Sequence, residues 1–421
     1  MGCREAQRRA SRRLRSGELR PGGNLPASSP EKGVIVSHSV SYITPQQLQR
    51  DLGIRDLSDP SEGPHAIQLL VGRAVDALTQ AWSCEVRWCP GPKSVPIADN
   101  YDRLGFGPET ITRDARYTRY VDGQHMLRSH SSAMIPSALR QLADGPTDDV
   151  LLVCPGMVFR RDVIDWQHTG TPHQLDLWRI SRRSLADGAM DDMISLLLGA
   201  LVPGLPYRQE SRVHPYTLMG RQVDVAHHDR WVEVWECGLA HPEVLDAAGL
   251  GGWNGLALGM GLDRLLMLVK GVPDIRLLRS TDHRIAEQML DLAPYRPVSS
   301  MPPITRDLSI AVSDDDDEET IGDTVRDVLG PDATCVEEVR VLSTTPSEQL
   351  PSSAVVRLGA QQGQRNLLVR IVFRDLEKTL TDQDANVLRD RIYGVLHQGT
   401  EFQWIVSPAI GLKHGHSERG R

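Results

Sequence analysis

Two arginine-bearing stretches, about a hundred residues apart, place the strongest constraint on this chain. The first is Gly156–Asp162 (GMVFRRD), where an apolar, strand-like run ends in charge and is followed by His168. The second is Gly255–Arg264 (GLALGMGLDR), which opens the apolar segment Leu265–Val269. An arginine at a strand end suits an α-phosphate, and one at a glycine-lined helix start suits a γ-phosphate. The pair favours nucleotidyl transfer from ATP.

Composition sets wide limits on what the chain can be. Its 421 residues, 40% of them hydrophobic, are enough for two or three domains with real cores. No apolar run approaches the ~20 residues that span a bilayer. The six cysteines include no Cys-x-x-Cys pair, and Cys84 and Cys89 lack further ligands nearby. We therefore expect a reduced, cytoplasmic compartment, without a disulfide framework or a zinc site.

The first 33 residues differ from the rest. Seven arginines stand in the first 20 residues against Glu5 and Glu18, and glycine and proline follow. This pattern predicts a disordered basic arm over 1–33. An arginine-rich, acid-poor start is also typical of an organelle transit peptide, and a loose tail is a third interpretation.

Residues 34–293 show a mixture of helix and strand signals. Strands are expected over Val34–Tyr42, Val150–Val153 and Met157–Arg160. The apolar residues of His65–Trp82 recur at helical spacing, and Ala189–Leu201 carries an apolar stripe, so both predict helices. Strands that alternate as a pair would are expected over Gln222–Val225 and Trp231–Cys237. The implied core is an antiparallel sheet with flanking helices, which is an α+β fold.

A proline-rich linker over 294–303 separates a second domain, 304–407, from the first, and a tail, 408–421, follows. The order of expected elements is strand, helix, two strands, helix and strand, which is the split of a ferredoxin-like fold. Its segments are Arg306–Val312, Glu319–Leu329, Val336–Ser343, Asn366–Phe373, Thr381–His397 with Thr381 as N-cap, and Glu401–Val406.

The two arginine stretches resemble motifs 2 and 3 of class II aminoacyl-tRNA synthetases, and most of all those of the phenylalanyl branch in its single-chain, mitochondrial-type form. The resemblance runs from Asp99 to Trp404, about three-quarters of the chain. Trp231–Leu245, followed by the Gly255–Arg264 stretch and Gly271–Leu277, carries most of it. The run Arg374–Asp382 resembles the ferredoxin-fold anticodon-binding domain that ends those enzymes. The resemblance implies an aminoacyl-tRNA ligase of the phenylalanine type that uses ATP and Mg²⁺.

The resemblance assigns roles around ATP. Arg160 would bind the α-phosphate and the substrate carboxylate, and Arg264 the γ-phosphate. Both are the expected catalytic residues, because transfer between two anions depends on neutralising charge. The remaining ATP-binding positions are Asp162, His168, Gly259 and Gly261, while Glu233 would bind Mg²⁺.

The resemblance also assigns an amino-acid pocket. Gln174 and Asp176 would hold the α-amino group, and His130 and Ser132 would line the pocket. Ala257 would form its small floor together with Gly259. The family's Phe-Pro-Phe, whose rings hold the substrate phenyl group, corresponds here to His214-Pro-Tyr216, so His214 and Tyr216 are expected to set side-chain choice.

Several positions depart from the family pattern. Pro172 stands where an adenine-stacking phenylalanine is usual, and Glu236 replaces a glycine beside the pocket. Asp162 and Asp176 are each one methylene shorter than the usual Glu. Polar groups in a buried pocket need partners, so a substrate that satisfies His214 and Tyr216 would be preferred over one that does not. The identity of the amino acid therefore stays open.

The sequence thus predicts an ATP- and Mg²⁺-dependent enzyme that activates an aromatic amino acid and charges tRNA, with a monomer preferred. Two alternatives remain. One is a paralogue that delivers the amino acid to a small molecule or carrier protein, and the other is a catalytically silent RNA-binding or regulatory module. From Ser300 to Arg421 the chain has 13 basic and 20 acidic residues, a balance of −7, which disfavours long-range attraction to tRNA.

Overall fold

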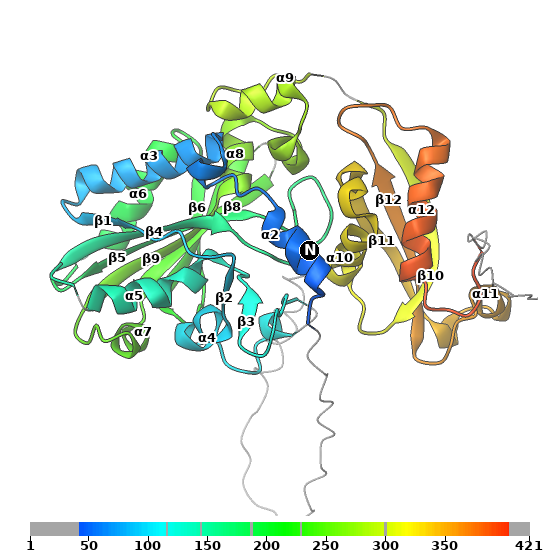
Figure 1. Cartoon of the computed structure of the whole chain (residues 1–421), viewed down its shortest axis with the longest axis horizontal. Helices are drawn as coiled ribbons and strands as arrows, with labels where there is room; N and C mark the ends of the chain where they lie inside the picture. The colour runs from blue at the N-terminus through cyan, green and yellow to red at the C-terminus, as the bar shows by residue number, and fades with distance from the viewer. Residues whose placement is uncertain are drawn as a thin grey trace, which may run out of the picture. The chain divides into compact units, whose positions relative to one another are not determined.

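The computed structural model describes residues 42–403, apart from 115–116, 144, 186–187, 228–229 and 299–300. The expected basic arm over 1–33, the tail over 408–421 and nearly all of the expected strand Val34–Tyr42 lie outside the described residues; Tyr42 itself forms a single bridge to Tyr120. The described chain forms one large β-sheet, one three-stranded sheet and a small two-stranded one (Figure 1).

The large sheet has seven strands in the order β1-β4-β5-β9-β8-β7-β6. Its pairs are antiparallel except at one edge, where β1 runs parallel to β4. This confirms the antiparallel sheet expected from the sequence. The strands are β1 (Glu85–Trp88), β4 (Asp149–Met157), β5 (His173–Ser181), β6 (Tyr207–Ser211), β7 (Thr217–His227), β8 (Arg230–Ala240) and β9 (Asn254–Gly261).

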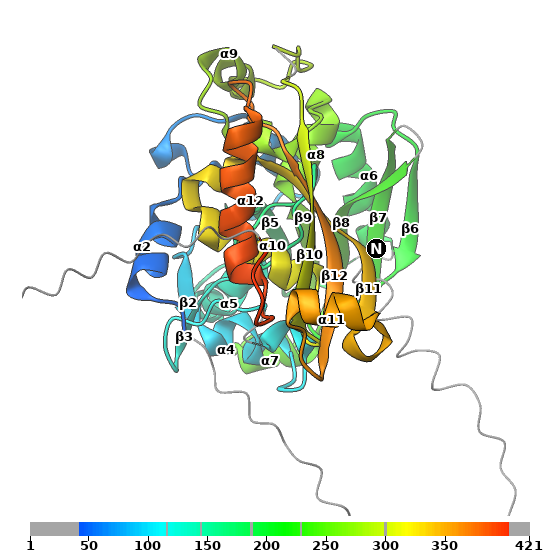
Figure 2. The same ribbon diagram turned by 90° about the vertical axis from the view of Figure 1, so that its right-hand side faces the viewer.

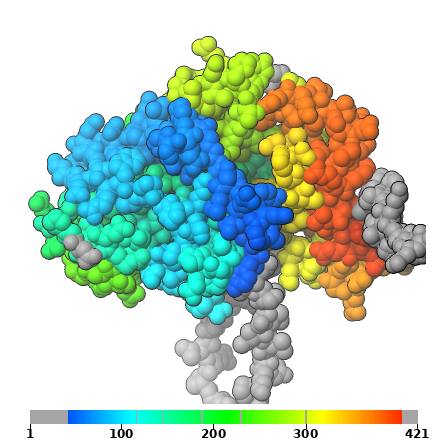
Figure 3. Space-filling view, viewed as in Figure 1, coloured from blue at the N-terminus to red at the C-terminus, as the bar shows by residue number. Residues whose placement is uncertain are grey.

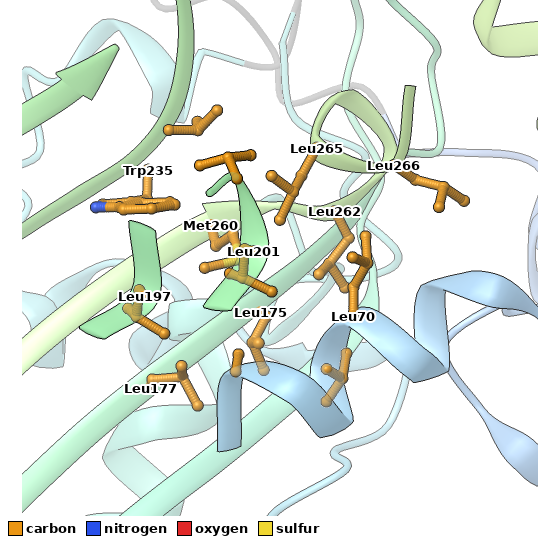
Figure 4. Close-up of a cluster of buried hydrophobic side chains, with 14 of the residues drawn as sticks. Leu70, Leu175, Leu177, Leu197, Leu201, Trp235, Met260, Leu262, Leu265 and Leu266 are labelled. Atoms are coloured by element: carbon orange, nitrogen blue, oxygen red, sulfur yellow. The ribbon is translucent and has the colours of Figure 1, made fainter. Parts of the chain in front are cut away.

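Helices cover both faces of this sheet (Figure 1). On one face, leucines of α3, α6 and α8 pack against Leu175, Leu177, Trp235 and Met260 of the sheet (Figure 4). On the other face, α5 and α7 pack over a second cluster that contains Trp178. Because both faces are covered, β4 carries no charged side chain after Asp149, and its apolar run made it recognisable as a strand. The helices are α3 (Ala66–Ala81), α5 (Ile135–Ala143), α6 (Ala189–Leu201), α7 (Pro242–Ala247) and α8 (Leu262–Lys270).

One expected strand needs correction. The sequence predicts strands over both Val150–Val153 and Met157–Arg160, but the structure has a single strand that ends at Met157. Beyond it, Val158 donates its N–H to the carbonyl of Pro172 at 2.8 Å. Proline has no N–H to return that bond, so pairing beyond Met157 is one-sided, and the next bond runs from the Arg160 N–H to the Gly170 carbonyl at 2.9 Å. The residues after Met157, Arg160 among them, therefore leave the regular strand.

The smaller β-sheet follows the linker. Its strands lie in the order β10-β12-β11, all antiparallel, and α10 and α12 pack on one face (Figure 2). Thr381 caps α12 through a capping box, which confirms the predicted N-cap. The elements are β10 (Ile304–Ser313), α10 (Glu318–Leu329), β11 (Val336–Pro346), α11 (Ser352–Leu358), β12 (Gln364–Phe373) and α12 (Asp382–Leu396).

The fourth strand of a ferredoxin-like fold is not among these elements. Residues 401–403 are not in a strand, and 404–406 lie outside the described residues. The strand order 1-3-2 agrees with the first three strands of the expected split, and the complete ferredoxin-like domain stays a prediction.

Helix α10 contacts the segments that surround the first arginine stretch. Arg119 bridges Asp51 and Asp323 at 2.7 and 2.8 Å, and Arg326 donates to the carbonyl of Val163 at 2.7 Å. On the outer side, α2 (Pro45–Gly53) lies next to α10, and the two are visible side by side in Figure 3.

The remaining short elements are β2 (Ser94–Pro96), β3 (His125–Leu127), α4 (Ile97–Asn100) and α9 (His283–Ala286). Within the described ranges, no helix combines the length and the apolar character needed to cross a bilayer.

A buried arginine holds the end of β4 in place. The side chain of Arg128 is only 2% exposed; its Nε donates to the Met157 carbonyl at 2.7 Å and its Nη1 to the Gly91 carbonyl at 2.8 Å. The carboxylate of Asp56 lies 3.5 Å away and accepts the N–H of Met157. At Gly156 a side chain would overlap the guanidinium, so this position requires glycine.

We expect Arg128→Met to lower the apparent free energy of unfolding by roughly 3–5 kcal/mol, because it leaves Asp56 as a buried, uncompensated charge. Urea unfolding followed by circular dichroism measures this change. Arg73→Met, at an exposed position of α3, is the matched control and should change it by less than about 0.5 kcal/mol. Equal effects of the two substitutions would contradict this role of Arg128.

Candidate functional site

Three adjacent strands, β5, β9 and β8, form the floor of the candidate site. Strand β9 alternates large and small residues: Leu256, Leu258 and Met260 enter the core shared with α3, α6 and α8. On the opposite face the same strand presents Ala257, Gly259 and Gly261. The side with almost no side chains is thereby left open for a ligand.

The strand register places two carboxylates on either side of this open strip. Asp176 of β5 is paired with Gly259, and Gly259 is paired with Glu236 of β8. Gln174 is paired with Gly261, one step further along the same face. The row Asp176–Gly259–Glu236 therefore crosses the floor of the site.

A β-bulge brings a third carboxylate to this face. The β7–β8 register shifts so that Val223 faces Trp235 while its neighbour Asp224 faces Glu233, which leaves one extra residue in β8. Without the bulge, Glu233 and Glu236 would point to opposite faces, because side chains alternate along a strand. With it, both line the same cavity.

The cavity over these strands has a volume of about 180 Å³. Every site residue expected from the sequence lines it: Arg160, Asp162, His168, His130, Ser132, Gln174, Asp176, His214, Tyr216, Glu233, Ala257, Gly259, Gly261 and Arg264. Pro172 and Glu236, the two positions that depart from the family pattern, line it as well.

The two arginines enter the cavity from different elements. Arg160 lies in the loop after β4, where its Nε donates to the Ser129 carbonyl at 2.9 Å. Among the described residues, its Nη groups have no hydrogen-bond partner. Arg264 is the third residue of α8, and its Nη1 lies 3.3 Å from the Glu233 carbonyl. Neither forms an ion pair within the described ranges, so both guanidinium groups can meet an anionic ligand.

Asp176 is fully enclosed beneath the cavity. It accepts a hydrogen bond from Trp178 Nε1 at 3.0 Å and another from the Ser131 hydroxyl. Burial raises the pKa of Asp176 to about 6, although hydrogen bonds from Ser131, Ser132 and Trp178 offset part of this effect. Next to it, the Gln174 side chain accepts the N–H of Ser131 at 3.1 Å. The pair forms a polar end of the pocket that suits an ammonium group.

The histidines of the site have different surroundings. His168 is bonded to Asp165 at 2.8 Å. His130 is half-buried, and its Nδ1, which is shielded from solvent, has no hydrogen-bond partner among the described residues. Burial, together with the charge of Arg160, lowers the pKa of His130 to about 3, so its imidazole is neutral at physiological pH.

At the other end of the row, Glu236 forms a charged cluster. His214 Nε2 lies 2.6 Å from Glu236 Oε2, and Arg212 Nε lies 2.6 Å from Oε1. Burial alone would raise the pKa of Glu236, but the hydrogen bond and charge of His214 and the charge of Arg212 outweigh it and hold that pKa below its usual value. Burial and the neighbouring Glu236 raise the pKa of Glu233.

Aromatic rings form one wall of the pocket. The ring of Tyr216 stacks on His214, with centroids 5.4 Å apart, and on Trp178 at 6.0 Å. Phe106 lies 6.0 Å from Tyr216 and 5.6 Å from His130. Burial raises the pKa of Tyr216 above its ordinary value, so its hydroxyl stays protonated. This wall suits a flat, apolar ring.

Sequence reasoning missed the residues that act through neighbours. Ser131 contacts Asp176 and Arg212 contacts Glu236, but the sequence assigned a role to neither, although Ser131 lies between the expected site residues His130 and Ser132. His173, the neighbour of Gln174, is fully buried and bonded to Asp263 at 2.9 Å, so it supports the junction of β5 with α8. Their position close to predicted site residues in the sequence was the one signal that could have identified Ser131 and Arg212.

The described residues contain no group of three or more His, Cys, Asp or Glu side chains that could hold a metal by themselves. A single carboxylate such as Glu233 still fits Mg²⁺, which proteins often bind through one or two carboxylates together with substrate phosphates.

The chain is similar to several known proteins. Residues 77–289 match the tRNA synthetase class II core domain (F), which is half of the chain. A phenylalanine–tRNA ligase alpha subunit from Prochlorococcus marinus is 33% identical over 204 residues, which cover 48% of this chain and 59% of that protein. This chain thus spans less than two thirds of that relative's length.

Two longer matches come from organellar enzymes. A chloroplastic/mitochondrial phenylalanine–tRNA ligase of Arabidopsis thaliana is 28% identical over 313 residues, covering 71% of this chain and 68% of that protein. A probable mitochondrial phenylalanine–tRNA ligase of Drosophila melanogaster is 26% identical over 357 residues, covering 71% of this chain and 74% of that protein.

The raised pKa of Asp176 predicts how the free energy of unfolding changes with pH. The folded protein binds this proton more tightly than the unfolded chain does, so ionising Asp176 costs stability as the pH rises from 4 to 7. We expect the stability of Asp176→Asn relative to wild type to increase by roughly 2 kcal/mol over that range. Urea unfolding at both pH values measures it. Asp246→Asn, at an exposed position, is the control, and a difference that does not change with pH would contradict the assignment.

Proposed function

We propose that this chain, which belongs to the tRNA synthetase class II core domain (F) family, activates an aromatic amino acid with ATP and transfers it to the 3′ end of a tRNA. The observation that carries the proposal is the single cavity in which both arginines and all expected substrate-binding residues meet. Its lining combines two arginines, a buried carboxylate and the stacked rings of His214 and Tyr216.

In the first step, a carboxylate oxygen of the amino acid attacks the α-phosphorus of ATP. The bond to the bridging oxygen breaks, and pyrophosphate leaves with the electron pair. Nucleophile and phosphate are both anions, so the main requirements are charge neutralisation and alignment. We assign the α-phosphate and the substrate carboxylate to Arg160 and the γ-phosphate to Arg264, with Asp162 and His168 beside the nucleotide.

The α-ammonium group would bind at Gln174 and Asp176. Proximity to a cation favours the ionised form, so binding would overcome the raised pKa of this buried carboxylate. The bare strip of Gly259 and Gly261 allows the substrates to approach the backbone closely. Magnesium, when bound, neutralises phosphate charge, and Glu233 is the residue that we assign to it.

In the second step, a ribose hydroxyl of the tRNA 3′ end attacks the acyl carbon and AMP leaves. A phosphate oxygen of the adenylate can take the hydroxyl proton, so no dedicated base is required. None of the histidines is assigned that task. His130 in particular, with its lowered pKa, would be a weak base.

The acceptor of the activated amino acid distinguishes tRNA charging from its alternatives. The acidic balance of −7 from Ser300 to Arg421 favours the alternative in which a small molecule or carrier protein receives the amino acid. A catalytically silent RNA-binding module is the third reading, and the retention of both arginines argues against it. One hydrophobic core is built from residues 57–289 and another mainly from residues 308–396, with Ile164 added, which supports a division into domains over 34–293 and 304–407. A cytoplasmic monomer stays our prediction, and two of the relatives are named as organellar.

We expect amino-acid-dependent exchange between ATP and pyrophosphate, and a loss on the order of 100-fold or more in Arg160→Ala and in Arg264→Ala, because each removes charge stabilisation. Arg183→Ala, an exposed arginine outside the cavity, is the matched control. The assay needs all common amino acids, hydroxylated and amino-substituted phenylalanines, and a repeat with total tRNA. Absence of exchange in every mixture would contradict the proposed function. Exchange without charging of any tRNA would favour the alternative acceptor.

A further inference from the structure

We propose that Glu236 selects the amino acid, and that the substrate carries a hydrogen-bond donor, a hydroxyl or an amine, on its aromatic ring. The inference rests on the proposed function and deepens it by naming the substrate class. It goes beyond the aromatic wall, which by itself would accept unsubstituted phenylalanine.

The first support is the distance between the two carboxylates of the floor. Asp176 and Glu236 are separated by one strand, and Gly259 between them has no side chain. Two strand spacings correspond to roughly 10 Å, which is comparable with the length of an extended aromatic amino acid. A substrate with its ammonium group at Asp176 can therefore lie across Gly259 and extend its other end towards Glu236.

The second support is spare acceptor capacity on Glu236. Oε2 is bonded to His214, and Oε1 lies 2.6 Å from Arg212 Nε. A carboxylate has about four lone-pair sites, so these two contacts leave some of them without a donor. A donor on the substrate would satisfy one of them.

The third support is the free-energy cost of placing an unsubstituted ring beside Glu236. An unsubstituted phenyl ring placed against Glu236 would cover a charged carboxylate without donating a hydrogen bond to it. His214 cannot relieve this, because its Nε2 is already committed to Glu236 and its Nδ1 lies 3.5 Å from the Thr217 hydroxyl. The pocket therefore discriminates against phenylalanine as well as attracting a donor.

The aromatic part of the substrate follows from the neighbouring wall. Tyr216 and His214 are stacked with their planes 28° apart and together present a flat surface beside Glu236. A ring can lie on this surface while its substituent reaches the carboxylate. An aliphatic amine or alcohol would reach Glu236 without using the wall.

The test measures binding directly. Isothermal titration calorimetry compares phenylalanine with its 3- and 4-hydroxy and 3- and 4-amino derivatives, on the wild type, Glu236→Gln and Glu236→Gly. We expect the wild type to bind at least one derivative on the order of 100-fold more tightly than phenylalanine. Glu236→Gly should reduce this ratio to within about threefold, and Glu236→Gln, which keeps an acceptor oxygen, should give an intermediate ratio.

Glu210→Gln is the matched control, since Glu210 lies on β6 outside the cavity, and it should leave the ratio unchanged. Thermal melting verifies that each variant is folded. Tightest binding of phenylalanine by the wild type, or a ratio that neither Glu236 variant changes, would overturn the inference.

Pyrophosphate exchange on the same proteins separates this inference from the proposed function. Selective binding of a derivative without exchange, even with total tRNA, would refute the function and leave the selection by Glu236 standing. Exchange that is fastest with phenylalanine would support the proposed function and refute the selection by Glu236. If no amino acid binds, both are refuted.

Discussion

The alternation of large and small residues along β9 is the constraint on which the rest of the structure depends. Leu256, Leu258 and Met260 fix the strand in the core, so its register with β5 and β8 is set by apolar burial. A slip of one residue would move these side chains into the cavity and the glycines into the core. Stability and an open floor thus have the same cause, and the positions of Asp176 and Glu236 follow from it.

The charged side chains of the cavity differ in how their charges are compensated. Asp176 has no cation at hydrogen-bonding distance and relies on neutral donors, which leaves its pKa raised. Glu236 lies between two basic side chains and has its pKa lowered. Arg160 and Arg264 form no ion pair among the described residues. An unpaired cation and an acid held near neutrality both remain ready for an oppositely charged ligand, whereas Glu236 is already charged and positioned before any ligand arrives.

Much of this arrangement was predictable from local pattern. The helix Ala189–Leu201 was predicted to the residue because its apolar stripe starts and ends sharply, and Thr381 was recognisable as an N-cap from its side chain. The residues of the cavity were found through two ordered motifs. What depends on pairing between distant strands was not found. The bulge that brings Glu233 and Glu236 together, the parallel edge pair of β1 and β4, and the contact of Arg212 with Glu236 all arise from register, and a single sequence does not record register.

The early end of β4 is a case in which the local pattern predicted a strand that the structure lacks. Val158–Arg160 is apolar enough to predict a strand, and only the partner strand reveals Pro172 opposite it. The consequence is functional, because the loop released at this point carries Arg160 into the cavity. A proline thus takes part in forming the site, although it carries no chemistry of its own.

The most direct measurement of the central claim is mass spectrometry of the adenylate that the protein forms. The full chain is incubated with ATP, Mg²⁺, inorganic pyrophosphatase, total tRNA and an equimolar mixture of amino acids that includes hydroxylated and amino-substituted phenylalanines. We expect an aminoacyl-AMP, or the aminoacyl-tRNA formed from it, whose acyl group is an aromatic amino acid with a donor on its ring. Formation of phenylalanyl-AMP in preference to these, or of no acyl product at all, would contradict it.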